Sequence, residues 1–320
     1  MFFGEGEVTE SNLNSFQGAG SAFGTRFIPR LKRAGFLARS RSKESLNQIY
    51  RIIGVAMAIE KIPGFNELAK LAARFYQQRL LNDIKSDGGV PEHVAIILDG
   101  NRRFAREVGV PTFVGHALGA EKLEEVLDWC RELGIKHVTV YAFSTENFNR
   151  PPAEVEALMD IFAEKLKKMA SDERIHKNKI KVRVIGDRTC LPARVVSAID
   201  ELEKVTRNYG DFFINIAMGY GGRAELVDAV RKICESVTKG EIKPDEVDEQ
   251  VIVKHLYTAG TPDPSLVIRT SGEERLSGFL LWQSAYSELY FCEAYWPAFS
   301  KTDFLRAIRT YQSRKRRFGK

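Results

Sequence analysis

The sequence predicts an α/β protein built on a parallel β-sheet, and two patterns indicate this. Short apolar runs recur after residue 90 and alternate with longer segments of helical period, the order that crossover connections between parallel strands produce. The clearest run, Val94–Leu98, is apolar throughout, as expected of a strand buried on both faces of such a sheet. Asp99 ends this run, and a glycine-containing turn leads into a helix that opens at Arg102 and Arg103.

Five further strands and six further helices are expected. The strand candidates are His137–Phe143, Lys181–Ile185, Phe212–Met218, Leu266–Ile268 and Leu289–Cys292. The helix candidates are Ala120–Leu133, Pro152–Ala170, Leu191–Asn208, Arg223–Lys239, Val247–Tyr257 and Thr302–Arg316. The helix after Pro152 has one apolar stripe, which either packs in the core or lines a cavity for an apolar ligand; it contains Val155, Leu158, Met159, Phe162 and Leu166.

The chain before the sheet is expected to form two segments. Residues 1–44 are rich in Gly, Ser and Arg and are predicted to be a basic, flexible tail. Within it, cations alternate with apolar residues from Arg26 to Lys43, a run that suits an anionic membrane surface, a solvated tail or a nucleic-acid contact. Residues 45–88 have a helical period interrupted at Pro63-Gly64 and are predicted to be a helical extension that ends at the turn Asp87–Pro91. Residues 89–320 form the main domain.

Composition limits the class of protein. The chain has 320 residues, 44% of them hydrophobic, and a net charge of +6, which fits a soluble globular protein with anionic partners. Charge alone points to nucleic acid, and because no recognisable nucleic-acid module accompanies it, no nucleic-acid partner is expected. The four cysteines lack CxxC spacing and are expected to be buried, reduced thiols and not disulfides or a zinc site. The longest apolar stretch, Ile52–Ile59, is too short to span a bilayer, and no signal peptide is visible, so we expect a cytoplasmic protein, with peripheral membrane contact left open.

Asp99 lies where open α/β sheets bind their ligands, at the carboxyl end of a central strand. The amides that follow it, of Gly100, Asn101, Arg102 and Arg103, stand at a helix N-terminus and favour an anion. A carboxylate next to an anion site suggests a cation between them, and Mg²⁺ held by one carboxylate plus substrate phosphates is a common arrangement. The alternative is that Asp99 only caps the helix.

Further polar side chains follow the other strands at the same edge. Because parallel strands share a carboxyl edge, one rim is expected to carry Asp99, Arg103, Ser144, Asn147, Arg150, Arg269, Arg275 and Ser277. Arginine forks suit the oxygens of phosphates, although any one of them could instead form a structural ion pair. The chain has no GxxxxGK[ST] loop, GxGxxG, HExxH or nucleophile elbow, so common nucleotide sites and acyl transfer are not indicated.

The segment from His93 to Ala105, HVAIILDGNRRFA, resembles the first signature region of the cis-prenyltransferases, the undecaprenyl and dehydrodolichyl diphosphate synthase family. Four more regions match that family in the same order: Tyr141–Pro151, Gly186-Asp187, Asn215–Arg223 and Asp263–Phe291. The resemblance extends from about His93 to Gly319. It implies the family's butterfly-like fold with a six-stranded parallel sheet flanked by helices, a hydrophobic tunnel, and elongation of an allylic prenyl diphosphate with isopentenyl diphosphate through cis double bonds.

The resemblance also implies roles for individual residues. Asp99 and Glu288 would bind Mg²⁺, and Asn147 is the position implicated in proton removal. The allylic diphosphate would be held by Gly100, Asn101, Arg102, Arg103, His116 and Arg150, with Phe104 and Phe148 beside the prenyl group. Isopentenyl diphosphate would be taken by Ser144, Arg269, Arg275 and Ser277, and the same substrate-binding segments include Thr145, Glu146 and Leu276. A homodimer is implied, with the tail Arg317-Phe318-Gly319 reaching the partner's site.

The sequence departs from the family pattern at several positions. Thr112 stands where many members have an arginine that binds phosphate, which leaves the acceptor and the regiochemistry open. Arg102 replaces a glycine common in bacterial members, and Phe104 and Phe148 stand where those members have Trp. The alternatives to chain elongation are therefore a member with a non-standard acceptor and a non-catalytic partner subunit.

Overall fold

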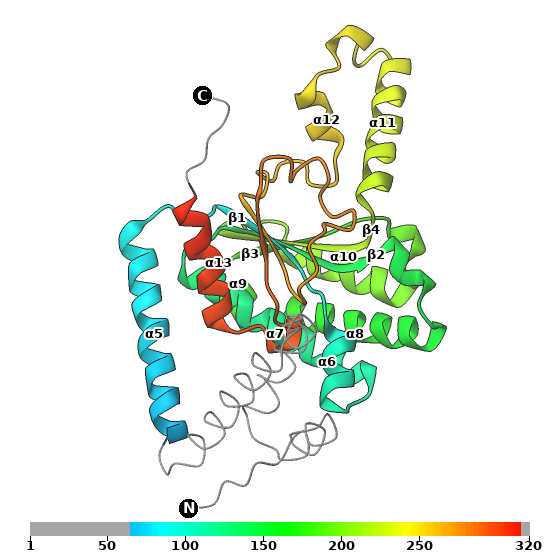
Figure 1. The fold of residues 1–320 in the computed structure, drawn as a ribbon. Coiled ribbons are helices and arrows are strands. Elements are labelled where there is room, and N and C mark those ends of the chain that lie inside the picture. The colour runs from blue at the N-terminus through cyan, green and yellow to red at the C-terminus, as the bar shows by residue number, and fades with distance from the viewer. Residues whose placement is uncertain (1–64, 315–320) are drawn as a thin grey trace, which may run out of the picture. The chain divides into compact units, whose positions relative to one another are not determined.

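The computed structural model describes residues 65–314, which contain a six-stranded parallel sheet (Figure 1). The strands are β1 (His93–Ile97), β2 (His137–Ser144), β3 (Ile180–Ile185), β4 (Phe212–Tyr220), β5 (Leu266–Arg269) and β6 (Glu288–Phe291). Their order is β3-β4-β2-β1-β5-β6, and every neighbouring pair is parallel. The predicted α/β fold is confirmed, with strand ends shifted by one or two residues.

Nine α-helices and four short 3₁₀ helices accompany the sheet within these residues. The α-helices are α5 (Phe65–Asp87), α6 (Asn101–Val108), α7 (Thr112–Glu132), α8 (Pro152–Ser171), α9 (Glu173–Lys177), α10 (Ala193–Thr206), α11 (Gly222–Thr238), α12 (Glu249–His255) and α13 (Lys301–Ser313). The 3₁₀ helices are η1 (Thr145–Asn149), η2 (Arg188–Cys190), η3 (Pro244–Glu246) and η4 (Trp296–Ala298). The short helix α9 was not predicted.

Helix α7 begins at Thr112 and not at Ala120 as predicted, because two glycines in its first turns weaken the helical pattern. The structure gives these glycines a packing role. A Cβ on Gly115 would lie 2.6 Å from the carbonyl oxygen of Asn101, and one on Gly119 would lie 2.2 Å from the Oδ1 atom of Asn101. Only glycine therefore allows α7 to approach the start of α6 this closely.

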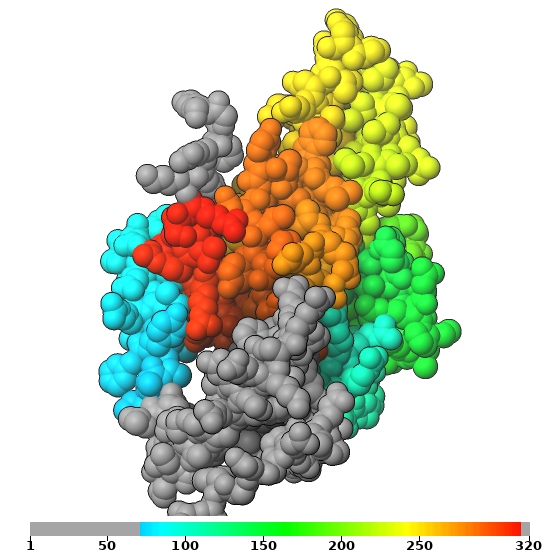
Figure 2. Space-filling model, in the orientation of Figure 1, coloured from blue at the N-terminus to red at the C-terminus, as the bar shows by residue number. Residues whose placement is uncertain are grey.

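The two faces of the sheet belong to different cores. Alternate residues of β1, such as Val94 and Ile96, pack in the larger core with α7, α8, α10 and α13. The intervening residues Ala95 and Ile97 pack in a smaller core around Phe279, which lies in the loop between β5 and β6. Figure 1 shows α7 and α8 on one side of the sheet and α11 and α12 extending from the other. The segment between β5 and α13, orange in Figure 2, occupies the middle of the face shown, between α13 and α11.

The chain divides into two compact units, Met1–Tyr76 and Gln77–Lys320. This division falls earlier than the boundary expected at Asp87–Pro91. The reason is that the last turns of α5 bury Leu80, Leu81 and Ile84 in the larger core, and Gln312 of α13 donates a hydrogen bond of 3.0 Å to the carbonyl of Ile84. The predicted basic tail, residues 1–44, and most of the predicted helical extension lie outside the described residues.

Two expectations from composition can be compared with the described residues. The four cysteines all lie within residues 65–314 and are free thiols. Cys130 and Cys292 are buried, as predicted, whereas Cys190 and Cys234 are exposed. Among the helices of this range, none combines the length and the apolar composition that a membrane span needs.

A buried histidine makes the stability of this domain depend on pH. The Nδ1 atom of His93 lies 2.6 Å from the carbonyl oxygen of Pro262, and its Nε2 atom lies 2.8 Å from Thr139 Oγ1. Burial lowers the pKa of His93 from 6.5 to about 4, and the nearby His137 adds to the shift. The folded chain therefore keeps His93 neutral at pH values at which the unfolded chain binds a proton.

We expect stability to fall as the pH is lowered from 6.5 to 4. The shift of His93 corresponds to a loss of about 3 kcal/mol over this range, and this loss should be smaller in a His93→Gln variant, whose amide can still donate and accept. Urea denaturation at pH 7, 5.5 and 4.5 measures the difference. An identical pH dependence in the two proteins would contradict the assignment.

Candidate active site

The site begins where β1 ends, at an ion pair between two neighbouring strands. The Oδ2 atom of Asp99 accepts a hydrogen bond of 2.8 Å from Arg269, at the end of β5, and lies 3.6 Å from a guanidinium nitrogen of Arg103. The side chain of Arg269 is 5% exposed and that of Asp99 is 26% exposed. Thr270 fixes the backbone of Asp99 next to the end of β5, because its hydroxyl donates to the carbonyl of Asp99 at 2.6 Å and accepts from the amide of Asp99 at 3.0 Å. The carboxylate is thus held at the mouth of the sheet.

Asp99 does not cap α6, so the alternative interpretation of this residue is wrong. Gly100 is the N-cap, with φ at 107°, and no side chain accepts a hydrogen bond at this helix end. A Cβ at Gly100 would lie 2.8 Å from the ring of Tyr295, so both the backbone conformation and the space require glycine. The uncapped amides of the first turn of α6 are free to bind an anion beside Asp99.

A second cluster gathers three nitrogen-bearing side chains around Glu154, in the first turn of α8. The Oε1 atom of Glu154 lies 3.2 Å from His116 Nε2, 3.2 Å from a guanidinium nitrogen of Arg150 and 3.6 Å from Arg102 Nε. Burial lowers the pKa of His116, while the hydrogen bond with Glu154 opposes that shift and the positive charge of Arg150 adds to it. Glu154 is not among the site residues predicted from the sequence, in which its spacing of four residues from Arg150 is the only signal.

A third group surrounds Arg269 on the side away from Asp99. One guanidinium nitrogen of Arg269 donates to Ser277 Oγ at 2.8 Å and to the carbonyl of Arg275. The loop that carries these partners contains non-glycine residues with positive φ, Ser271 at 79° and Ser277 at 49°. Such conformations are strained and tend to occur at functional sites.

Several buried polar atoms at this rim have no hydrogen-bond partner among the described residues. They are Asn101 Oδ1, Arg269 Nε and Ser271 Oγ. Because an unsatisfied buried polar group is costly, such atoms are candidates for contact with a bound ligand.

A cavity of about 830 Å³ leads away from this rim, between the sheet and helices α7 and α8. At the rim it is lined by Asp99, the residues Gly100–Arg103, His116, Ser144, Glu146, Asn147, Arg150, Arg269 and Ser277. Further along, apolar side chains predominate, among them Leu123, Leu127, Leu158, Phe162, Ile214 and Ile216. The apolar stripe of α8 therefore does both things considered for it: Leu158 and Leu166 belong to the core and also line the cavity.

Five predicted substrate residues lie outside the described lining of this cavity. One of them, Arg275, forms an ion pair with Glu273 instead. Phe104 and Phe148 are absent from its described lining, and Phe148 instead packs edge-on against Phe143 with ring centroids 4.8 Å apart. Thr145 lines a smaller cavity of about 480 Å³ next to the start of α11, which Glu146 and Ser277 also line. Leu276 packs against the smaller core.

Glu288, which the resemblance implies as a second metal ligand, does not lie beside Asp99 of the same chain. Glu288 begins β6 and is paired with Leu266, which is paired with Val94. Asp99 is five residues further along the sheet, a separation of about 16 Å at roughly 3.3 Å per residue. Glu288 forms an ion pair with Arg314 at the opposite edge. The predicted tail contact, Arg317–Gly319, lies outside the described residues.

At the rim, Asp99 offers Mg²⁺ a carboxylate beside the uncapped amides of α6. Residues 65–314 contain no group of three His, Cys, Asp or Glu side chains that could hold a metal ion. Asp99 can supply a single oxygen ligand, because Arg269 already binds its Oδ2 atom. Mg²⁺ characteristically accepts one or two carboxylates and takes its other ligands from phosphate and water, so this donor set suits an ion that arrives with a diphosphate.

Comparison with known proteins decides the family. Residues 97–319 match the family described as "Putative undecaprenyl diphosphate synthase". The chain belongs to the cis-prenyltransferase family. The match confirms the resemblance of the five sequence motifs to this family. The protein is therefore an enzyme that transfers prenyl groups.

Three relatives illustrate the range of that family. The chain is 56% identical over 243 residues to "Tritrans,polycis-undecaprenyl-diphosphate synthase (geranylgeranyl-diphosphate specific)" of Methanopyrus kandleri, covering 76% of this chain and 90% of that relative. It is 53% identical over 249 residues to the "Isoprenyl transferase" of Thermus thermophilus, covering 77% and 94%. A crystal structure of lavandulyl diphosphate synthase from Lavandula x intermedia, in complex with dimethylallyl diphosphate, is similar with a TM-score of 0.68 at 37% identity, covering 72% of this chain and 99% of that one.

Glu154 should control the protonation of His116. We expect a Glu154→Gln variant to lower the pKa of His116 further, because it removes the negative charge that opposes the effect of burial and leaves only a neutral acceptor. Titration of the His116 ring protons by NMR measures this directly. Glu156→Gln, two residues away and paired with Arg194, is the matched control; an unchanged or raised pKa in Glu154→Gln would refute the contact.

Proposed function

We propose that this cis-prenyltransferase uses Mg²⁺ to condense isopentenyl diphosphate with an allylic prenyl diphosphate, forming cis double bonds and a longer polyprenyl diphosphate that serves as a lipid carrier precursor. One observation carries the proposal. Asp99, with Arg103 and Arg269 against it, stands at the mouth of a largely apolar cavity that follows the sheet. A charged mouth suits two diphosphates, and an apolar interior suits a growing hydrocarbon.

The allylic diphosphate would bind at the first turn of α6 and at the cluster around Glu154. Arg102, Arg150 and His116 converge there from three different elements. In the reaction, the allylic C–O bond breaks, a C–C bond forms to the acceptor, and one proton leaves the acceptor. Negative charge grows on the departing diphosphate, and donors fixed in advance stabilise it more effectively than water can. Mg²⁺, held by Asp99 and the phosphates, would neutralise part of that charge.

The acceptor would bind on the other side of Asp99. Arg269 donates to Ser277 and lies beside the smaller cavity next to α11, where the amide of Gly222 already donates to the carbonyl of Gly278. Asn147 lies between the two diphosphate positions, and its Oδ1 atom accepts a hydrogen bond of 3.2 Å from the amide of Ser144. This contact orients the Asn147 side chain and leaves its NH2 group free to donate to a diphosphate oxygen, and the proton lost by the acceptor would pass to the departing diphosphate.

Geranylgeranyl diphosphate is our proposed allylic primer. Support comes from the relatives that are 54 to 56% identical to this chain, whose names specify that primer. The test is a panel of allylic diphosphates of increasing length, with product lengths determined by mass spectrometry. A preference for a shorter primer would overturn this assignment without affecting the proposed reaction.

Transfer to a different acceptor is the second candidate. The similarity to lavandulyl diphosphate synthase and the threonine at position 112 favour it. The length of the cavity favours elongation, because a single condensation between short prenyl groups does not need an apolar channel along the sheet. A third candidate, a non-catalytic partner subunit, predicts that the purified chain incorporates isopentenyl diphosphate only when a second protein is added.

Assembly and location also belong to this proposal. We propose a homodimer in which the tail Arg317–Gly319 approaches the partner's site, and peripheral membrane contact through the basic run Arg26–Lys43. The apolar product supports the second point, since it must leave water for a lipid phase.

Asp99 should be required for the chemical step. We expect Asp99→Asn to lower turnover by about 10²–10³-fold, or about 2.7–4 kcal/mol of barrier, because it removes the charge that holds the cation. Incorporation of labelled isopentenyl diphosphate measures the rate, and chelation of Mg²⁺ by EDTA should abolish it in the wild type. The control is Asp160→Asn, which changes an exposed residue of α8 that forms an ion pair with Arg194 of α10. Near-normal turnover in Asp99→Asn would contradict the role of this carboxylate.

A further inference from the structure

The cavity ends in a wall of charged side chains. It begins at the carboxyl edge of the sheet, near Asp99 and Ser144, and its lining extends to Phe212 and Ile180, the first residues of β4 and β3. It therefore follows the full length of β2, about 23 Å at roughly 3.3 Å per residue. At and near this far end the lining also contains Glu124, Asp128, Arg131, Lys165, Lys168, Asp172, Arg174 and Asn178.

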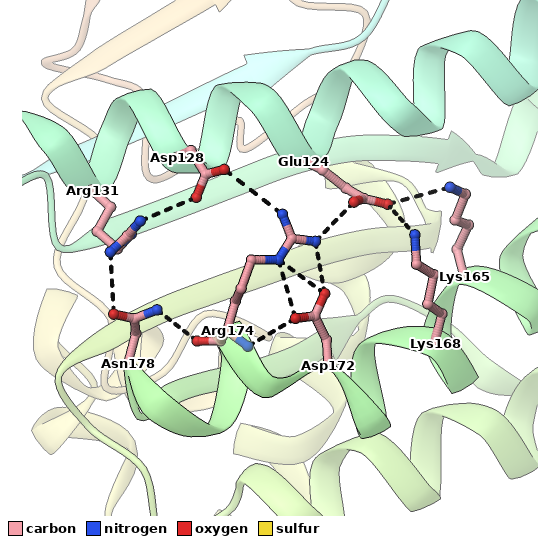
Figure 3. A network of polar contacts seen from close by, with 8 residues as sticks. All are labelled: Glu124, Asp128, Arg131, Lys165, Lys168, Asp172, Arg174 and Asn178. Atoms are coloured by element: carbon pink, nitrogen blue, oxygen red, sulfur yellow. Dashed lines mark hydrogen bonds and ion pairs between the residues drawn. The ribbon is translucent and has the colours of Figure 1, made fainter.

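These eight residues form one network, which joins α7 to α8 and α9 (Figure 3). On α7, Glu124 accepts hydrogen bonds of 3.3 Å each from Lys165 and Lys168 of α8 and one of 2.9 Å from Arg174 of α9. Figure 3 shows the Arg174 guanidinium between the two helices, where it also contacts Asp172 at 2.7 Å and Asp128 at 3.7 Å.

A second link in the network connects the end of α7 to the residue that follows α9. Arg131 lies 3.4 Å from Asp128 and donates to Asn178 Oδ1 at 3.2 Å. Hydrogen bonds from Arg174 hold the pKa of Asp172 below its usual value. Burial alone would raise the pKa of Glu124, but its bonds to Arg174, Lys168 and Lys165 lower it, so the network stays ionised at neutral pH.

The network is only one side chain thick. Its members line the cavity, yet the side chain of Arg174 is 49% exposed and that of Lys168 is 55% exposed. No further layer of apolar packing therefore separates this part of the cavity from solvent. Exposed ion pairs contribute little to stability and are weakened by salt. Lys and Arg can also place their methylene stems against hydrocarbon while the charged ends stay in water, so the wall can open while the core remains packed.

We propose that this network is a gate that limits the length of the product, with Arg174 as the specificity-determining residue. The inference rests on the proposed chain elongation. While the gate is closed, the growing prenyl tail meets charged groups at the end of the cavity, and elongation stops because burying these groups against hydrocarbon is unfavourable. When the gate opens, the tail passes between α7 and α9 and elongation continues.

The decisive variant is Glu124→Gln, because it removes the charge at the centre of the network with almost no change in volume. We expect its products to be longer than those of the wild type by one or more isoprene units, measured by mass spectrometry with the same primer. Arg174→Met, which keeps a long side chain but lacks its charge, should shift the products in the same direction. Glu156→Gln is the matched control: it makes the same substitution on α8, breaks the ion pair with Arg194 and leaves the cavity lining unchanged.

Ionic strength supplies an independent test of the charge. Raising the salt from about 0.1 M to about 1 M shortens the Debye length from about 10 Å to about 3 Å. Wild-type and Glu156→Gln products should then lengthen, whereas those of Glu124→Gln should change less.

The outcomes separate this inference from the function on which it depends. If the wild type makes polyprenyl products but both gate variants give unchanged or shorter ones, the gate is refuted and the elongation activity stands. If the wild type makes no product with any primer, the proposed function fails and the gate fails with it. Circular dichroism of each variant verifies that it is folded.

Discussion

The pairing of β1 with β5 is the constraint on which the site depends. These two strands are neighbours in space although more than 160 residues separate them in the chain, and their register pairs Ile97 with Arg269. The chain leaves β1 toward α6 and α7 on one face of the sheet, and leaves β5 toward the loop around Phe279 on the other. Such a divergence opens a crevice at the carboxyl edge, and Asp99 and Arg269 face each other across it. A shift of this register would separate the carboxylate from the arginine that orients it.

Much of this arrangement could be predicted from local sequence. The strand β1 was identifiable because a strand buried on both faces must be apolar throughout, and the rim was identifiable because parallel strands end at one edge. The polar residues predicted after β1 and β5 are brought together in the structure, whereas Glu288 lies away from Asp99 of the same chain. Sequence position gives no register, and only the pairing of Glu288 with Leu266 shows that this residue lies at the amino edge.

Other features left no local signal. Glu154 is an ordinary acidic residue in the first turn of a helix, and its importance depends on His116 and Arg102, which reach it from α7 and α6. The network around Arg174 likewise joins residues about 50 positions apart. Arg174 itself lies on α9, which is too short to show a helical period in the sequence. Long-range polar contacts of this kind follow from how helices dock on the sheet, which the spacing of charges in one segment does not determine.

The cavity beneath the sheet also bears on folding stability. Side chains such as Leu158 and Ile216 line this space, so part of their surface lacks the close protein neighbours that other core residues have. A long hydrocarbon bound there would supply the missing dispersion contacts and complete the hydrophobic core. By mass action, the folded state then becomes more stable as lipid accumulates. The thermal stability of this enzyme should therefore be understood as a property of the protein together with its product.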